Sequence, residues 1–83
     1  MKVERAELEK KIIEYAKETF KEPEMTLQSV LNEAEGYDSM AHVQFLVDIE
    51  DWCGVQLEDS EVRRDHTVRD VVEIVEKKLQ EKE

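Results

Sequence analysis

The stretch that decides the fold is GYDSMAHVQFLVDIEDWCG, residues 36–54. On a wheel at about 100° per residue, most of its apolar side chains fall on one broad arc, with acidic side chains opposite. Asp38 is a good N-cap, because its carboxylate can accept hydrogen bonds from the exposed amides of a first turn. Gly54 suits the position after a helix, where glycine adopts left-handed backbone at low cost. The stretch therefore predicts an amphipathic helix that opens at Asp38 and ends near Cys53.

The wheel separates a core face from a surface that could meet a partner. The core face comprises Val43, Phe45, Leu46, Ile49 and Cys53, with His42 in the same arc. Met40 and Val47 form a small apolar pair flanked by acids, and such exposed pairs often mark partner sites. Ser39 stands at the helix N-terminus with an exposed hydroxyl, where backbone amides could bind a phosphate attached to it.

Outward from this helix, the chain predicts further helices and one long loop. Apolar residues recur at four-residue spacing over residues 3–20, which indicates an amphipathic helix. Residues 21–37 carry scattered apolar positions and are predicted to be a long loop with at most a short helical turn. Residues 59–64 could form one short helix, and a capping pattern at Thr67–Asp70 opens the last helix. The prediction is an all-α fold, a small up-down four-helix bundle with a long first loop and a short third helix.

The length and the net charge of the chain limit the classes of protein to which it can belong. Eighty-three residues make one small domain, residues 1–83, and the net charge is −10. Residues 22–62 hold eleven acidic side chains and no Lys or Arg, which disfavours nucleic-acid and anionic-membrane binding. Cys53 is the only cysteine, so neither an internal disulfide nor a multi-cysteine metal site is expected. With no apolar signal region or membrane-length run, we expect a cytoplasmic monomer.

The segment Gly36-Tyr37-Asp38-Ser39-Met40 resembles the G-x-D-S-L/M motif of acyl carrier proteins. The resemblance covers nearly the whole chain. The predicted helix lengths, the long first loop, the acidic middle, the pattern Val43-x-x-Leu46-x-x-Ile49-Glu50 and the Thr67-Val68 cap follow in the family's order.

The resemblance implies a non-catalytic carrier. Ser39, with Asp38 beside it, would bear 4′-phosphopantetheine through a phosphodiester, and the arm's terminal thiol would hold the acyl group as a thioester. A phosphopantetheinyl transferase would load the serine, and acyl-transferring and condensing enzymes would dock through basic patches. The implied partner-binding residues are Met40, Val47, Glu50, Asp51, Asp59 and Glu61. The implied acyl pocket lies near Val43, Leu46 and Leu57.

Three positions depart from the family pattern, and they bear on the pathway in which the carrier would act. Ala41 and Gln44 stand where fatty-acid carriers commonly have acids, and Glu35 replaces an apolar residue. These differences suggest a specialised lipid or polyketide-like pathway rather than housekeeping fatty acid biosynthesis.

Other readings of the same residues remain open. The alternative to a carrier is a cofactor-free acidic helical protein-interaction module. A Ser39–His42 hydrolytic dyad is disfavoured, because no orienting acid or G-x-S-x-G elbow accompanies it. The acidic run from Asp48 fails as a calcium loop, since Cys53 occupies the required glycine position, and no metal site is predicted.

Overall fold

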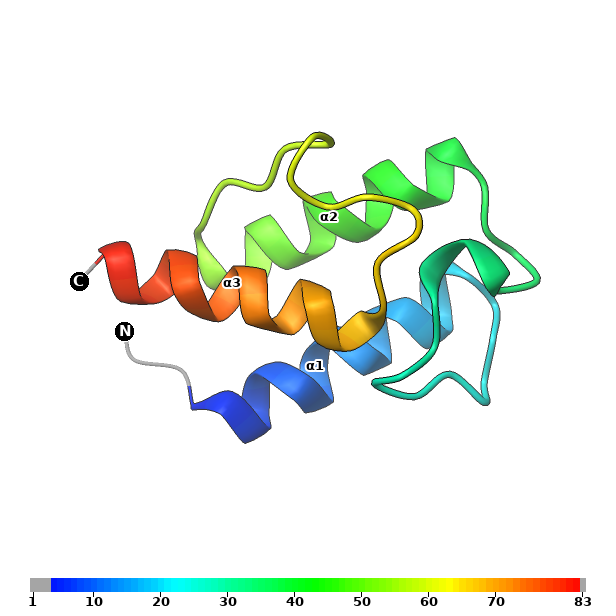
Figure 1. Cartoon of the computed structure of the whole chain (residues 1–83), viewed down its shortest axis with the longest axis horizontal. Coiled ribbons are helices and arrows are strands. Elements are labelled where there is room, and N and C mark those ends of the chain that lie inside the picture. The colour runs from blue at the N-terminus through cyan, green and yellow to red at the C-terminus, as the bar shows by residue number, and fades with distance from the viewer. Residues whose placement is uncertain (1–3, 83) are drawn as a thin grey trace.

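The computed structural model describes residues 4–82. Its helices are α1 (Arg5–Thr19), the 3-10 helix η1 (Leu31–Glu33), α2 (Ser39–Cys53) and α3 (Val68–Lys82), as Figure 1 shows. No strand forms between residues 4 and 82, where the β-type pairing is a single antiparallel bridge between Val30 and Thr67. The all-helical prediction is therefore confirmed.

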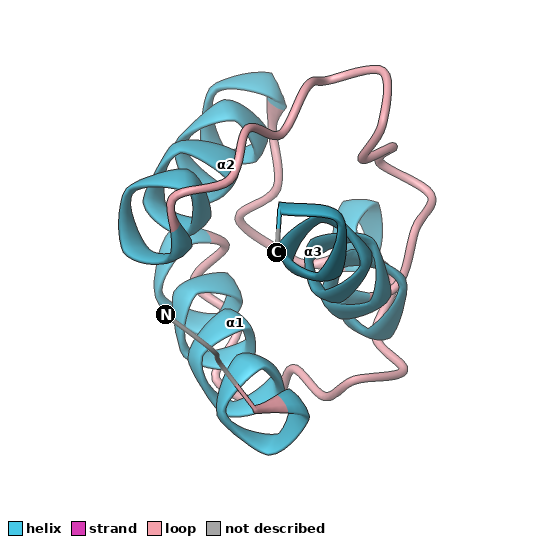
Figure 2. Cartoon of the chain, turned by 90° about the vertical axis from the view of Figure 1, so that its left-hand side faces the viewer, coloured by secondary structure: helices cyan, strands magenta, loops and turns pink. Residues whose placement is uncertain are grey.

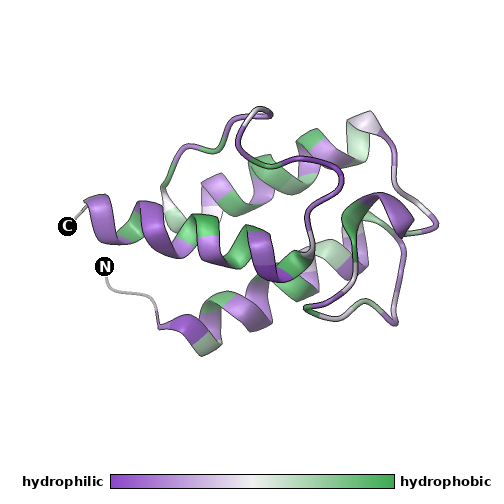
Figure 3. Ribbon diagram, in the orientation of Figure 1, coloured by the Kyte–Doolittle hydropathy of each residue, from purple (hydrophilic) through white to green (hydrophobic). Residues whose placement is uncertain are grey.

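The three α-helices form a triangle when viewed along the bundle (Figure 2), and α1 packs against both of the others. Polar and apolar residues alternate along each ribbon (Figure 3), as expected of amphipathic helices. Leu8, Ile12 and Ala16 of α1 are fully buried, as their spacing predicts. At one end of the α1–α2 interface, the rings of Tyr15 and Trp52 meet edge to face with centroids 6.4 Å apart. The predicted start of α1 at residue 3 lies outside the described residues.

Capping interactions fix the end of α2 and the start of α3 at the residues that the sequence predicts. Gly54 adopts left-handed backbone with φ 74°, and its amide donates to the Glu50 carbonyl. At the start of α3, the Thr67 amide donates to the Asp70 carboxylate at 3.0 Å. The Asp70 amide donates in return to the Thr67 hydroxyl at 3.1 Å, which completes a capping box.

The long first loop is fixed to the segment that leads into α3. The amides of Leu31 and Asn32 donate to the carbonyls of His66 and Arg64, at 2.9 and 3.0 Å. The Val68 amide donates to the Ser29 carbonyl at 3.0 Å. These bonds join two stretches that are distant in sequence, so the loop before α2 is held in a defined position.

The predicted short helix at residues 59–64 is not formed, so residues 4–82 hold three α-helices and the predicted four-helix bundle is not confirmed. One turn forms where the amides of Glu61 and Val62 both donate to the Glu58 carbonyl. The Val62 carbonyl then accepts from the His42 ring, and the Arg64 carbonyl accepts from the Asn32 amide. In a continuing helix these two carbonyls would accept hydrogen bonds from amides further along the same segment. Here they accept hydrogen bonds from distant residues instead.

Candidate functional site

Gly36 positions the start of the site against the end of α1. Its amide donates to the Phe20 carbonyl at 2.9 Å. A β-carbon at residue 36 would lie 2.4 Å from that carbonyl oxygen and 2.9 Å from its carbon. Because the obstacle is backbone and not a flexible side chain, only glycine permits this approach. The close contact fixes the chain three residues before α2 begins.

Asp38 fixes the first turn of α2. Its carboxylate accepts from the Ala41 amide at 2.7 Å, and its carbonyl accepts from the His42 amide at 2.9 Å. Ser39 is therefore the first residue of the helix, and it is exposed. Its hydroxyl makes no hydrogen bond within residues 4–82. The result is an accessible hydroxyl at the positive end of a fifteen-residue helix.

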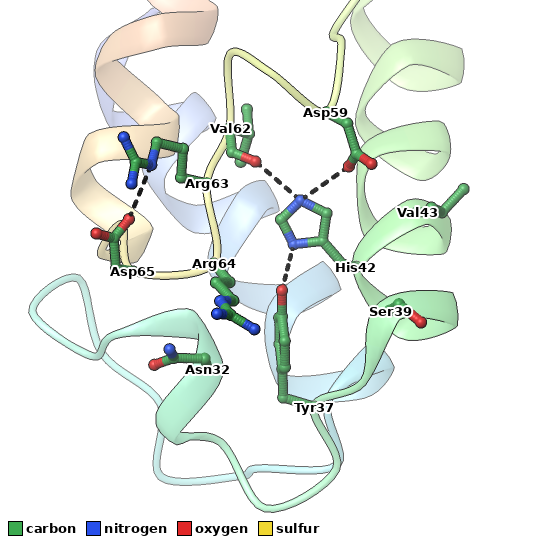
Figure 4. A pocket seen from close by; sticks show the side chains of 10 residues that line it. All are labelled: Asn32, Tyr37, Ser39, His42, Val43, Asp59, Val62, Arg63, Arg64 and Asp65. Carbon is green, nitrogen blue, oxygen red and sulfur yellow. Dashed lines mark hydrogen bonds and ion pairs between the residues drawn. The ribbon is translucent and has the colours of Figure 1, made fainter.

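His42 connects α2 to the segment before α3, as Figure 4 shows. Its side chain is buried, with 5% of the residue exposed. Nε2 lies 2.9 Å from the Val62 carbonyl and 3.4 Å from an Asp59 carboxylate oxygen, and Nδ1 lies 2.8 Å from the Tyr37 hydroxyl. Because a carbonyl can only accept, Nε2 carries a proton. With both nitrogens engaged, His42 is not placed to act as a base for Ser39.

A cavity of about 560 Å³ opens beside Ser39. It lies between the start of α2, the loop before α2 and the segment before α3 (Figure 4). Partial burial raises the pKa of the Tyr37 phenol, and nearby Arg64 offsets part of this rise. The lining residues are Asn32, Tyr37, Ser39, His42, Val43, Asp59, Val62, Arg63, Arg64 and Asp65.

The residues predicted for the acyl pocket differ in burial, and one of them lines the cavity. Val43 is 50% exposed and lines the cavity, so its predicted place on the core face is wrong. Leu46 and Leu57 are buried in the core and do not line this cavity. Cys53, also predicted on the core face, is half-buried, and its thiol donates to the Ile49 carbonyl at 3.0 Å.

The residues predicted for partner binding divide into two kinds. Met40 and Val47 are exposed, at 82% and 38%, and so is Asp51. Asp59 is also exposed, although one of its carboxylate oxygens lies 3.4 Å from His42 Nε2. Glu50 and Glu61 instead contact their own chain. The Glu50 carboxylate accepts from the Leu57 amide at 2.7 Å, and the Glu61 carboxylate pairs with Lys78 at 2.6 Å. The hydrogen bond from Lys78 lowers the pKa of Glu61 below its ordinary value.

Sequence reasoning missed the far wall of the cavity, which Asn32, Arg63, Arg64 and Asp65 contribute. One signal was available, since Arg63-Arg64 ends the run of residues without basic side chains. The position of Asn32 depends on its amide bond to the Arg64 carbonyl, which no local pattern reveals.

Neither a metal-ligand cluster nor a membrane-length apolar helix occurs among the described residues. Within residues 4–82, no three His, Cys, Asp or Glu side chains are grouped so as to hold a metal ion. None of the helices there combines the length and apolar character needed to cross a bilayer.

Residues 10–75 match the profile of the PP-binding family, described as a phosphopantetheine attachment site. The match covers most of the chain, so the chain belongs to this family, and the predicted resemblance is confirmed. Members of the family are non-catalytic carriers with covalent 4′-phosphopantetheine. This chain is therefore a phosphopantetheine carrier and not an enzyme. Comparisons with curated proteins and with solved structures found no match.

Proposed function

We propose that this chain is an acyl carrier protein and that Ser39 bears its phosphopantetheine. The observation that carries the proposal is the exposed Ser39 hydroxyl, which has no hydrogen-bond partner in the described chain and stands at the N-terminus of α2. The amides of the first turn lack intrahelical acceptors and favour an attached phosphate. The cavity beside Ser39 leaves room for an arm or its cargo.

Loading is a phosphoryl transfer from coenzyme A. A bond forms between Ser39 Oγ and the phosphorus that bears pantetheine, the pyrophosphate bond breaks, and adenosine 3′,5′-bisphosphate leaves. The hydroxyl proton needs a base, and two candidates close to Ser39 in the sequence already make hydrogen bonds of their own. Asp38 caps the helix, and both nitrogens of His42 are engaged. The base therefore comes from the phosphopantetheinyl transferase, and the arm's thiol supplies the thioester that holds the acyl group.

The partner surface is proposed to be the exposed side of α2 together with the segment that follows it. Met40 and Val47 supply apolar contact, and Asp51 and Asp59 supply negative charge for enzymes with basic patches. Glu50 and Glu61 add to the negative field while their carboxylates also bind the chain itself. Ala41 and Gln44 favour a specialised lipid or polyketide-like pathway, which we place in the cytoplasm.

The test is the intact mass of the protein after incubation with coenzyme A and a broad-specificity phosphopantetheinyl transferase. We expect the mass to increase by one phosphopantetheine, and Ser39→Ala should abolish this increase. Ser60→Ala, which removes an exposed loop serine, is the control and should keep it. Circular dichroism would show that both variants remain helical. A gain by Ser39→Ala would show that another residue is the attachment site. No gain by the folded wild type would contradict the carrier function and favour a cofactor-free interaction module.

A further inference from the structure

The cavity beside Ser39 is lined mainly by polar side chains. Eight of its ten lining residues are polar, and the exceptions are Val43 and Val62. The backbone carbonyl of Val62 accepts from His42. An alkyl chain seated here would remove polar groups from water without giving them hydrogen bonds, which is unfavourable. The lining suits a ligand that itself bears polar or charged atoms.

Among the charged side chains of the cavity, Arg64 differs from the others. Arg63 pairs with Asp65 at 3.5 Å, and Asp59 lies 3.4 Å from Nε2 of His42. Arg64 makes no ion pair within the described residues. Its carbonyl is held by the Asn32 amide at 3.0 Å, so its backbone is anchored at the wall of the cavity. In Figure 4 its guanidinium extends towards Tyr37, on the side of the cavity that leads to Ser39.

We propose that this cavity receives an acyl group that ends in a carboxylate, and that Arg64 pairs with that carboxylate. The proposal rests on the carrier function proposed above. A guanidinium binds a carboxylate through two parallel hydrogen bonds, and no carboxylate of the described chain occupies it. Arg64 is therefore a specificity-determining residue that selects dicarboxylic cargo over alkyl cargo of equal length. A cavity of about 560 Å³ lies within the usual range for small ligands.

One other anion could reach Arg64, namely the phosphodiester of the arm itself. The two sources differ in when the anion arrives. The phosphodiester is present as soon as the arm is attached, whereas the carboxylate arrives only with the cargo. Comparing the arm alone with the acylated arm separates them.

The experiment uses the unloaded protein and three loaded forms, which a transferase makes from coenzyme A, pentanoyl-coenzyme A and glutaryl-coenzyme A. Pentanoyl and glutaryl have chains of equal length and differ in the terminal carboxylate. Cleavage of each thioester by hydroxylamine is measured relative to the same thioester on free pantetheine. We expect the glutaryl form to be protected about 1.4- to fivefold more than the pentanoyl form, the range typical of an exposed ion pair. The nuclear magnetic resonance signal of the Arg64 side chain should shift between the arm-only and glutaryl forms.

Arg64→Gln should abolish the extra protection, and Arg63→Gln is the matched control because Arg63 already pairs with Asp65. Equal protection of both acyl groups, or protection retained in Arg64→Gln, would overturn the proposal. The Arg64 signal could also shift fully when the arm is attached and no further with glutaryl. That result would show that Arg64 pairs with the phosphodiester instead. Failure to load appears as the absence of a mass gain and contradicts the carrier function itself, so the two failures are distinguishable.

Discussion

A single glycine controls how the loop before α2 meets the end of α1. The Gly36 amide bonds the Phe20 carbonyl, and there is no room for a β-carbon beside it. Two residues later Asp38 caps α2, so the position of Ser39 depends on both residues. The glycine of the motif thus has a structural function that is independent of attachment chemistry.

Gly36→Ala should lower the free energy of unfolding by about 1–3 kcal/mol, the usual cost of forcing atoms into a packed site. The reason is the 2.4 Å approach that the new β-carbon would make to the Phe20 carbonyl oxygen. Urea denaturation followed by circular dichroism measures the change. Glu35→Ala, at an exposed neighbouring position, should stay within about 0.5 kcal/mol of wild type. Equal stability of Gly36→Ala and wild type would show that the loop relaxes away from α1.

Residue-level predictions succeeded where the interaction is local. The Asp38 cap, the Thr67–Asp70 capping box and the left-handed Gly54 each depend on residues within four positions along the chain. Val43 was misplaced because a helical wheel shows where a side chain points but not whether another helix covers that face. Asn32 and Arg64 could not be paired from sequence, since their contact depends on how two distant loops meet.

At the scale of elements, the segment between α2 and α3 is held by bonds to its neighbours rather than by a helix of its own. The His42 ring of α2 donates a hydrogen bond to the Val62 carbonyl, and Lys78 of α3 forms an ion pair with the Glu61 carboxylate. Its sequence alone allows a short helix, and propensity is a weak guide when tertiary bonds compete. The three α-helices were predictable because each has its own periodic apolar face and its own cap signals.

The Glu61–Lys78 pair gives stability that depends on pH. Lys78 lowers the folded-state pKa of Glu61 below its ordinary value of 4.5. A carboxyl whose folded pKa is lowered stabilises the fold above its unfolded pKa, and this contribution is lost as pH falls through the folded pKa. Lys78→Gln should therefore cost about 0.2–1 kcal/mol near neutral pH, since the pair is partly exposed and screened. The cost should disappear at pH values well below 4.5.

Urea denaturation at several pH values would measure this difference. Lys77→Gln is the matched control, because Lys77 is the exposed neighbour on the same helix and makes no ion pair within residues 4–82. It should show no such pH-dependent loss. A loss of stability that is equal for both variants, or that persists at low pH, would mean that the Glu61–Lys78 ion pair does not stabilise the fold.

At the scale of the whole molecule, charge is segregated along a very small body. Eleven acids and no Lys or Arg occupy the 22–62 stretch, and the molecule measures 36 × 24 × 18 Å. The screening length is about 30 Å at 0.01 M salt and about 8 Å at 0.15 M. At low salt, each acid therefore interacts with most of the others.

Raising sodium chloride from 0.01 to 0.15 M should raise the melting temperature by roughly 4 °C, which corresponds to about 1 kcal/mol or less for a domain of this size. Calorimetry measures the shift. Asp51→Asn removes one exposed charge from the acidic run and should give a smaller salt dependence. A melting temperature that does not change with salt would indicate that the acidic charges do not destabilise the folded protein.

The contact between Tyr15 and Trp52 gives the protein an intrinsic optical reporter. Trp52 is the only tryptophan, and it stands near the end of α2 opposite Ser39, about 20 Å away at 1.5 Å per residue. Its emission therefore reports the docking of α2 on α1 without an added label. Fluorescence changes during unfolding follow the helix interface, while chemistry at Ser39 takes place too far away to alter the indole directly. Stability and loading can thus be followed separately in one sample.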